Sequence, residues 1–181
     1  MKIPYTLVRS HRKTIAIHIT PEGTVEVRCP RRCSRAEVEA FVLSKQDWIV
    51  RHLERISRQP VLAKLSESEI RFLAEQAAAI LPERVRQLAA EMGVSYGRIT
   101  IRRQKTRWGS CSAQGNLNFN CLLMLAPQQV RDYVLIHELC HRKHLNHSRE
   151  FWEEVERFCP DYRACKKWLK ENQQHLIGRL P

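Results

Sequence analysis

The chain has 181 residues, of which 43% are hydrophobic and 28% are charged. These proportions are typical of a globular protein and exclude collagen-like, low-complexity and intrinsically disordered classes. No apolar run approaches the roughly 20 residues that a membrane helix needs, and basic residues follow the N-terminus where a signal peptide would have an apolar core. We therefore expect a single domain over residues 1–181, located in the cytoplasm and without a membrane segment.

The chain is strongly basic. Lys and Arg together number 31, Asp and Glu number 19, and the net charge is +12. Such a surplus favours anionic partners, nucleic acid among them. The basic residues are spread along the chain and do not form one arm, which also fits an ordinary solvated surface. The charge therefore leaves a nucleic-acid partner open without requiring one.

The seven cysteines do not form a recognisable disulfide framework. Their number is odd, their spacing is irregular, and no C-x-x-C pair occurs. Cys29 and Cys33 lack the second pair of ligands that a structural zinc site needs. We expect the cysteines to be reduced and mostly buried as small apolar side chains.

The N-terminal part is predicted to contain strands followed by a helix. Residues 5–29 alternate and are rich in β-branched side chains, with a turn signal at Pro21-Glu22-Gly23, as in a β-hairpin. Ser34-Arg35-Ala36-Glu37 is a capping box, and the apolar residues behind it recur at helical spacing. One helix should therefore run from this box to about Ser57, before a break at Gln59-Pro60.

A long helix is predicted next. It should begin near Ser66 or Ser68 and end at Gly93, which suits a C-terminal cap. Pro82 lies within this segment and should kink or restart the helix.

The following segments predict a small sheet and a further helix. Residues 98–102 form a short strand pattern, residues 106–112 a loop, and residues 116–126 one or two strands. We therefore expect an α+β fold, with a small antiparallel or mixed sheet packed on helices. A hairpin region and helix, residues 1–58, would precede a core formed by residues 66–181.

The helix after these strands carries His137-Glu138-Leu139-Cys140-His141, an H-E-x-x-H motif. Residues four apart lie about 40° from each other around a helix, so both imidazoles can bind one zinc ion. Zinc lowers the pKa of a bound water to about 7, and Glu138 can take the proton of that water and pass it to a leaving amine. Because the flanking residues are apolar, the helix should be buried, and its polar side chains need a metal or other partners.

A catalytic zinc needs a third protein ligand and an open position. His144 lies about 10 Å from His137 along a straight helix, too far to share one ion. His147 can ligate only if the helix ends first, and a left-handed Asn146 with Ser148 as the next N-cap would provide that end. The spacing matches that of metzincins, apart from His144 where they have Gly, and it favours His147. The alternatives are carboxylates of the next helix: Glu150, Glu153 and Glu154.

Beyond this motif, a longer ordered series of residues resembles the YgjP-like metallopeptidase domain, a family of SprT-related zincins. The series comprises Arg107-Trp108-Gly109-Ser110-Cys111, Asn118 to Asn120, Tyr133-Val134, the H-E-x-x-H helix, Asn146-His147-Ser148, Phe151-Trp152 and Pro160-Asp161-Tyr162. The resemblance covers nearly the whole chain. It implies a minimal zincin-like fold, one Zn²⁺ on His137, His141 and His147, and Glu138 as catalytic base. It also implies relatives that act on nucleic-acid-associated proteins.

Several other residues of this series are candidates for the site. In zincins the substrate pairs with an edge strand beside the active-site helix, and the strand around residues 117–125 is the expected one. A tyrosine one turn before the motif could stabilise an oxyanion or simply pack. The apolar face of the helix after His147 should hold that ligand in place. The candidates for substrate binding or for support of the metal ligands are Arg107, Trp108, Asn118, Asn120, Tyr133 and Trp152.

We expect a zinc metallopeptidase that hydrolyses a protein or peptide substrate. One alternative is a basic nucleic-acid-binding protein whose metal site is structural or vestigial, and another is a protease recruited to nucleic acid by its charge. A structural site would need a fourth His or Cys ligand and would not need Glu138.

Overall fold

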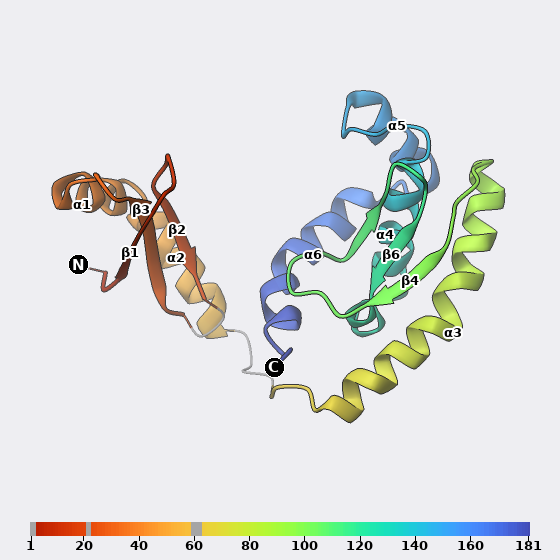
Figure 1. Cartoon of the computed structure of the whole chain (residues 1–181), viewed down its shortest axis with the longest axis horizontal. Coiled ribbons are helices and arrows are strands. Elements are labelled where there is room, and N and C mark those ends of the chain that lie inside the picture. Colours follow the sequence, from red (N-terminus) through yellow and green to blue (C-terminus); the bar gives the residue numbers. More distant parts are fainter. Residues whose placement is uncertain (1–2, 21–22, 59–62) are drawn as a thin grey trace. The chain divides into compact units, whose positions relative to one another are not determined.

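The computed structural model describes residues 3–20, 23–58 and 63–181. The chain divides into two compact units, Met1–Leu62 and Ala63–Pro181 (Figure 1). Each unit has its own hydrophobic core. The sequence predicts one domain with two subregions, and the boundary between the units falls between those subregions. In the part of the chain that is described, no helix combines the length and apolar character needed to cross a membrane.

The N-terminal unit contains a three-stranded sheet. β2 (Ala16–Ile19) and β3 (Val25–Pro30) are antiparallel, as in the predicted hairpin, and β1 (Thr6–Ser10) is parallel to β3, so the strand order is β1-β3-β2. Of the predicted turn Pro21-Glu22-Gly23, the first two residues lie outside the described part. The φ of Gly23 is +83°, a value that favours glycine.

Two helices follow this sheet where one was predicted. α1 (Arg35–Ser44) begins with the predicted capping box at Ser34, and α2 (Gln46–Arg58) follows after Lys45. The Lys45 N–H donates to the carbonyl three residues back, so one tight turn interrupts the helical ladder. The predicted break at Gln59-Pro60 lies outside the described residues.

The long helix of the C-terminal unit is α3 (Glu67–Met92). Ser66 caps it through a box with Glu69, and Gly93 ends it in the left-handed conformation with φ +64°. Pro82 lies inside α3 without breaking it, so the predicted restart does not occur, and the helix bends along its length (Figure 1). Proline cannot donate the backbone hydrogen bond at this position. Buried residues on both sides of Pro82 pack into the core, and this packing keeps α3 continuous.

A second three-stranded sheet follows α3. β4 (Ile99–Arg102) is parallel to β6 (Leu117–Asn120), and β5 (Gly109–Cys111) is antiparallel to β6. The strand order is therefore β4-β6-β5.

This order corrects two predictions. The segment 106–112, expected as a loop, contains the strand β5. The strand expected at the edge, around residues 117–125, is the central strand β6 followed by a 3₁₀ helix, η1 (Cys121–Leu125). Because β6 is hydrogen-bonded to a neighbour on each side, it has no free edge, and β5 is an edge strand.

Three helices complete the C-terminal unit: α4 (Gln128–Cys140), α5 (Arg149–Phe158) and α6 (Tyr162–Ile177). α4 packs against β5, α3, α5 and α6. The Arg84 guanidinium joins α3 to α4 through hydrogen bonds of 3.1 and 3.0 Å to Asp132. The predicted α+β fold, with small mixed sheets and helices, is confirmed.

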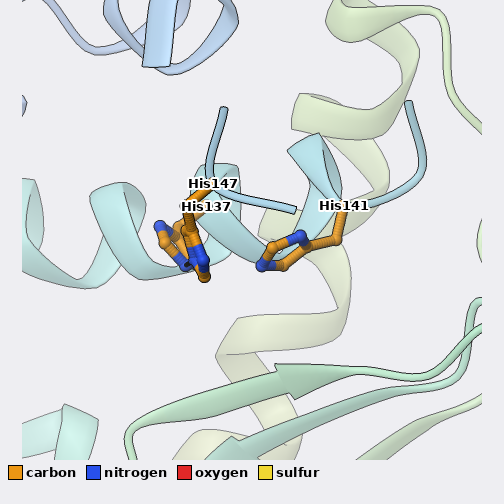
Figure 2. Close-up of side chains that lie close together, drawn as sticks. All are labelled: His137, His141 and His147. Carbon is orange, nitrogen blue, oxygen red and sulfur yellow. Dashed lines mark hydrogen bonds between the residues drawn. The ribbon is translucent and has the colours of Figure 1, made fainter. Parts of the chain in front are cut away.

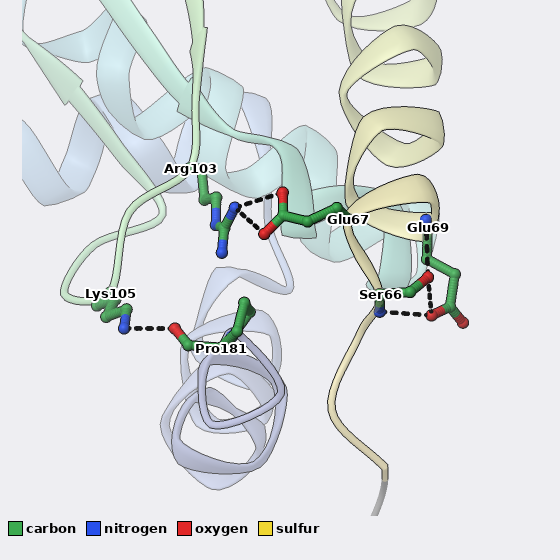
Figure 3. A network of polar contacts seen from close by, with 6 residues as sticks. All are labelled: Ser66, Glu67, Glu69, Arg103, Lys105 and Pro181. Carbon is green, nitrogen blue, oxygen red and sulfur yellow. Dashed lines mark hydrogen bonds and ion pairs between the residues drawn. The ribbon is translucent and has the colours of Figure 1, made fainter.

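The loop after β4 is tied to two other parts of the C-terminal unit (Figure 3). Nη1 of Arg103 lies 2.9 Å from each carboxylate oxygen of Glu67, in the first turn of α3. Nζ of Lys105 donates to the carbonyl oxygen of Pro181 at 2.6 Å. These contacts fix the loop shortly before Arg107, one of the candidate site residues.

Candidate metal centre

The end of α4 presents the H-E-x-x-H motif. His137 and Glu138 lie near its C-terminus, and His141 follows Cys140 directly as the cap residue. The apolar neighbours of the motif are buried in the core, so the packing of α4 determines where both imidazoles point. Figure 2 shows that the two rings are directed toward the same region, next to His147.

After His141 the chain makes a tight turn. The His144 N–H donates to the Cys140 carbonyl at 2.9 Å, and the two residues before it each bond to a carbonyl three residues back. Among the described residues only glycines have a positive φ, so the expected left-handed Asn146 is wrong. Ser148 has an extended backbone at the predicted N-cap position of α5, but its side chain makes no capping hydrogen bond. The reversal therefore needs no left-handed residue, and histidine at position 144 is accommodated without strain.

Three imidazoles converge at this turn. One ligand nitrogen from each of His137, His141 and His147 lies within 4.8 Å of the others, and Nε2 of His137 is 3.1 Å from Nε2 of His147. Nδ1 of His141 lies 3.0 Å from the His144 carbonyl oxygen, so a proton on Nδ1 leaves Nε2 as an acceptor. The cluster contains no carboxylate. A set of facing nitrogen acceptors fits a divalent cation with a preference for imidazole, such as zinc.

The acids of α5 lie outside this cluster. Glu153 pairs with Arg149, and Glu154 pairs with Lys143, which ties the turn after α4 to α5. Within the described residues, the cluster comprises the three histidines alone. It includes none of the carboxylates considered as alternative ligands, Glu150, Glu153 and Glu154.

Burial favours the neutral form of His137 and His147. It lowers the pKa of His137 to about 3, with smaller contributions from the charges of His141, His147 and Lys166. It also lowers the pKa of His147 below its ordinary value. Metals bind the neutral imidazole, so at neutral pH these two rings are already in the form that a metal requires.

Glu138 is buried beside the cluster, with 6% of its surface exposed. Burial raises the pKa of its carboxyl to about 8, although the charge of Arg107 and a hydrogen bond from the Cys111 backbone lower it in part. Gly109 of β5 lies so close that a Cβ there would be 2.6 Å from Oε1 of Glu138. Only glycine permits this approach. The need for glycine at position 109 was not predicted from the sequence, where its one signal is a glycine within a short strand.

These groups share one cavity of about 380 Å³. The three histidines, Glu138 and Leu145 contribute to its lining from α4 and the turn that follows. Arg107 and residues 109–112 contribute the rest, so the edge strand β5 borders the same space as the histidines.

Two aromatic residues of α5 pack against the histidines. Phe151 is fully buried, and its ring centroid lies 4.7 to 4.9 Å from those of the three histidines. The ring of Trp152 lies 5.8 Å from those of His137 and His147 and stacks on Tyr162 at 5.3 Å. The apolar face of α5 therefore packs against His147, the contact on which the predicted supporting role depends.

The remaining candidates divide between the cavity and the core. Arg107 lines the cavity, whereas its neighbour Trp108 is buried in the core. Tyr133 is also buried, with its ring 5.9 Å from that of His137, and burial raises the pKa of its hydroxyl.

The two asparagines of β6 lie on the framework that supports the cavity. Asn120 is fully buried, and its Nδ2 donates to the carbonyls of Gln104 and Arg107 at 2.7 and 3.0 Å. Asn118 is half-buried and donates to Oγ of Ser110 at 3.2 Å. Neither is among the described residues that line the cavity.

A buried glutamate beside three converging imidazoles, two of them from an H-E-x-x-H helix, is typical of metallopeptidases. The family profile of the YgjP-like metallopeptidase domain matches residues 13–70 and 62–172. The chain belongs to this family, which confirms the resemblance seen in its sequence and places it among the hydrolases that cleave peptide bonds. None of the curated proteins compared with the chain matches it.

Two solved structures are similar to part of the chain. The metallopeptidase zymogen of Pyrococcus abyssi abylysin is 23% identical, with a TM-score of 0.47, over 52% of this chain and 96% of its own. The metallopeptidase zymogen of Methanocaldococcus jannaschii jannalysin is 21% identical, with a TM-score of 0.41, over 49% of this chain and 94% of its own.

Proposed function

We propose that the chain is a zinc-dependent peptidase in which His137, His141 and His147 hold the metal and Glu138 is the general base. The observation that carries the proposal is the convergence of three imidazole nitrogens within 4.8 Å of one another, in one cavity with a buried carboxylate. When bound, zinc supplies Lewis acidity that lowers the pKa of a water molecule to about 7. Three ligands among the described residues support an open site, since a structural zinc site usually has four.

Glu138 is suited to accept a proton from water and return it to the leaving amine. Its carboxyl lines the same cavity as the three histidines. Burial raises its pKa to about 8 in the metal-free chain, and a bound cation would lower that pKa toward neutral pH, where one group can both accept and donate a proton efficiently. The Cys111 backbone and the close approach of Gly109 restrict the orientation of the carboxyl group.

The edge strand β5 supports a position for the peptide substrate. β5 pairs with β6 on one side only, and its three residues line the cavity. An extended peptide can add to such an edge through main-chain hydrogen bonds. We therefore propose β5, in place of the strand first expected, as the strand that binds the substrate beside the histidines. A nucleic-acid partner and a cytoplasmic location remain predictions from composition.

Metal content tests the ligand set. Elemental analysis should find about one zinc per wild-type chain, purified without a metal-affinity column. His147→Ala should lose most of this zinc. His144→Ala is the matched control and should retain it, because the contact between residue 144 and His141 is made by a backbone carbonyl. Equal zinc retention by His147→Ala would refute the third ligand.

Hydrolysis tests the role of Glu138. Wild-type protein loaded with zinc should cleave quenched fluorescent peptides, and a chelator should stop the reaction. Glu138→Gln should retain the zinc of the wild type while losing peptide hydrolysis by about a hundredfold or more, the contribution typical of general acid–base catalysis. Activity close to that of the wild type in this variant would remove Glu138 as the base.

A further inference from the structure

Arg107 places an exposed positive charge at the cavity. Among the described residues it is the only Lys or Arg in the cavity lining. Its charge reaches Glu138, whose pKa it lowers. Yet no acid in the described part of the chain lies within ion-pair distance of its guanidinium. The donors of this side chain are therefore available to a ligand.

The backbone that carries this side chain is firmly anchored. The Arg107 carbonyl accepts from Nδ2 of the buried Asn120 at 3.0 Å. The carbonyl of the buried Trp108 accepts from the Asn120 N–H at 2.8 Å. On the other side, Lys105 binds the Pro181 carbonyl. A guanidinium on an anchored backbone has less freedom to lose when it binds than one on an unrestrained loop.

The charges around the cavity select the kind of ligand. Glu138 is the only acid among the described lining residues, and it is buried beneath Gly109 of β5. Arginine matches a carboxylate with two parallel N–H···O bonds, a geometry that lysine lacks. A peptide offers a carboxylate either at its C-terminus or on an Asp or Glu side chain.

We propose that Arg107 binds a carboxylate of the peptide that pairs with β5, so that the preferred substrates carry a carboxylate close to the bond that is cut. Arg107 precedes β5 by two residues, which places its side chain near one end of a peptide paired with this strand. The location of the peptide rests on the function proposed above. Recognition of the carboxylate itself does not require hydrolysis and can be measured without it.

A binding experiment separates this inference from catalysis. All proteins are full-length, loaded with zinc and carry Glu138→Gln, so that no peptide is consumed. Fluorescein-labelled octapeptides are compared by anisotropy in two matched series. The first series compares a free C-terminus with a C-terminal amide, and the second compares Asp with Asn at each position in turn. The two series distinguish a terminal carboxylate from a side-chain carboxylate.

The ratio of dissociation constants within a matched pair is the readout. We expect at least one pair to favour the carboxylate by about tenfold, the lower end of the effect of a charge-assisted hydrogen bond. Arg107→Gln should bring this ratio close to one, and Arg107→Lys should restore part of it. Arg98→Gln is the control, because Arg98 is exposed in the same unit and does not line the cavity.

Two outcomes would overturn the proposal. One is a ratio close to one for every pair in the parent protein, and the other is a preference that Arg107→Gln leaves intact. Peptide hydrolysis by the protein with Glu138 present is measured separately. Carboxylate preference without any hydrolysis would refute the proposed peptidase and leave carboxylate binding by Arg107 standing. Hydrolysis without the carboxylate preference would support the proposed peptidase and refute carboxylate binding by Arg107.

Discussion

Asn120 offers a sharp test of how the cavity is supported. Its side chain is fully buried and makes three hydrogen bonds to the backbone. Nδ2 donates to the carbonyls of Gln104 and Arg107 at 2.7 and 3.0 Å, and Oδ1 accepts from the Leu122 N–H at 3.1 Å. Asn120→Leu keeps the number and branching of the side-chain heavy atoms and leaves all three backbone groups without this partner.

The expected cost follows from these contacts. A hydrogen bond contributes about 1 kcal/mol net, and a buried polar group left unsatisfied costs about 1–3 kcal/mol. Three such groups, partly offset by the greater hydrophobicity of leucine, give a loss of about 3 kcal/mol in the free energy of unfolding. The loss should also free the backbone of Arg107 and weaken the carboxylate preference proposed above.

Urea unfolding followed by tryptophan fluorescence measures this loss. Trp108, Trp152 and Trp168 report on the C-terminal unit. The matched control is Asn118→Leu on the same strand, where the side chain is half-buried and its hydrogen bonds, of 3.2 and 3.4 Å, are longer. It should lose less than about 1 kcal/mol. Equal losses in the two variants would refute the assignment of Asn120 as a buried support.

Three further predictions concern the site and its surroundings. In Gly109→Ala, a Cβ would lie 2.6 Å from Oε1 of Glu138; displacement of the carboxyl should reduce peptide hydrolysis more than about tenfold, and elemental analysis should find zinc content unchanged. In metal-free protein, the raised pKa of Glu138, about 8, means that the folded state binds more protons than the unfolded state between about pH 4.5 and pH 8. The stability from this group is thus complete below pH 4.5 and lost as the pH rises through 8. At pH 7 the free energy of unfolding of Glu138→Gln, measured in urea, should be about 3 kcal/mol above that of the wild type, and at pH 4.5 the two should differ little. A difference in this free energy that does not change with pH would contradict the raised pKa of Glu138. Cys140 is fully buried, and burial raises the pKa of its thiol to about 12; mass spectrometry after brief iodoacetamide treatment should find it alkylated much later than the half-buried Cys33, and the reverse order would show that the end of α4 opens readily.

Several predictions that depend only on neighbours along the chain agree with the structure. The capping boxes at Ser34 and Ser66 and the left-handed Gly93 involve groups within a few residues of each other, so a short stretch of sequence specifies them. The H-E-x-x-H motif is likewise specified by a short stretch of sequence. Helix geometry alone puts His137 and His141 on one face, and the apolar residues around them turn that face in a defined direction.

The third histidine is an intermediate case. The spacing of His147 after the motif identified it as a candidate, and the cluster contains it. The turn that brings it there was predicted incorrectly at Asn146, because the reversal uses hydrogen bonds to the last carbonyls of α4 and an ion pair from Lys143 to α5. Several backbone paths can join two helices, and packing against α5 selects one of them.

By itself, then, the sequence determined the α+β class, the resemblance to the YgjP-like metallopeptidase domain, and a motif able to hold a metal. Only the tertiary structure decided which strand is at the edge, that Gly109 lies against Glu138, and that Arg107 lines the cavity while Trp108 and Asn120 are buried. The physical reason is that an alternating strand pattern records burial but not the identity of the neighbouring strands. Whether a side chain of a loop meets the cavity or the core depends on elements that are distant in the chain and adjacent only after folding.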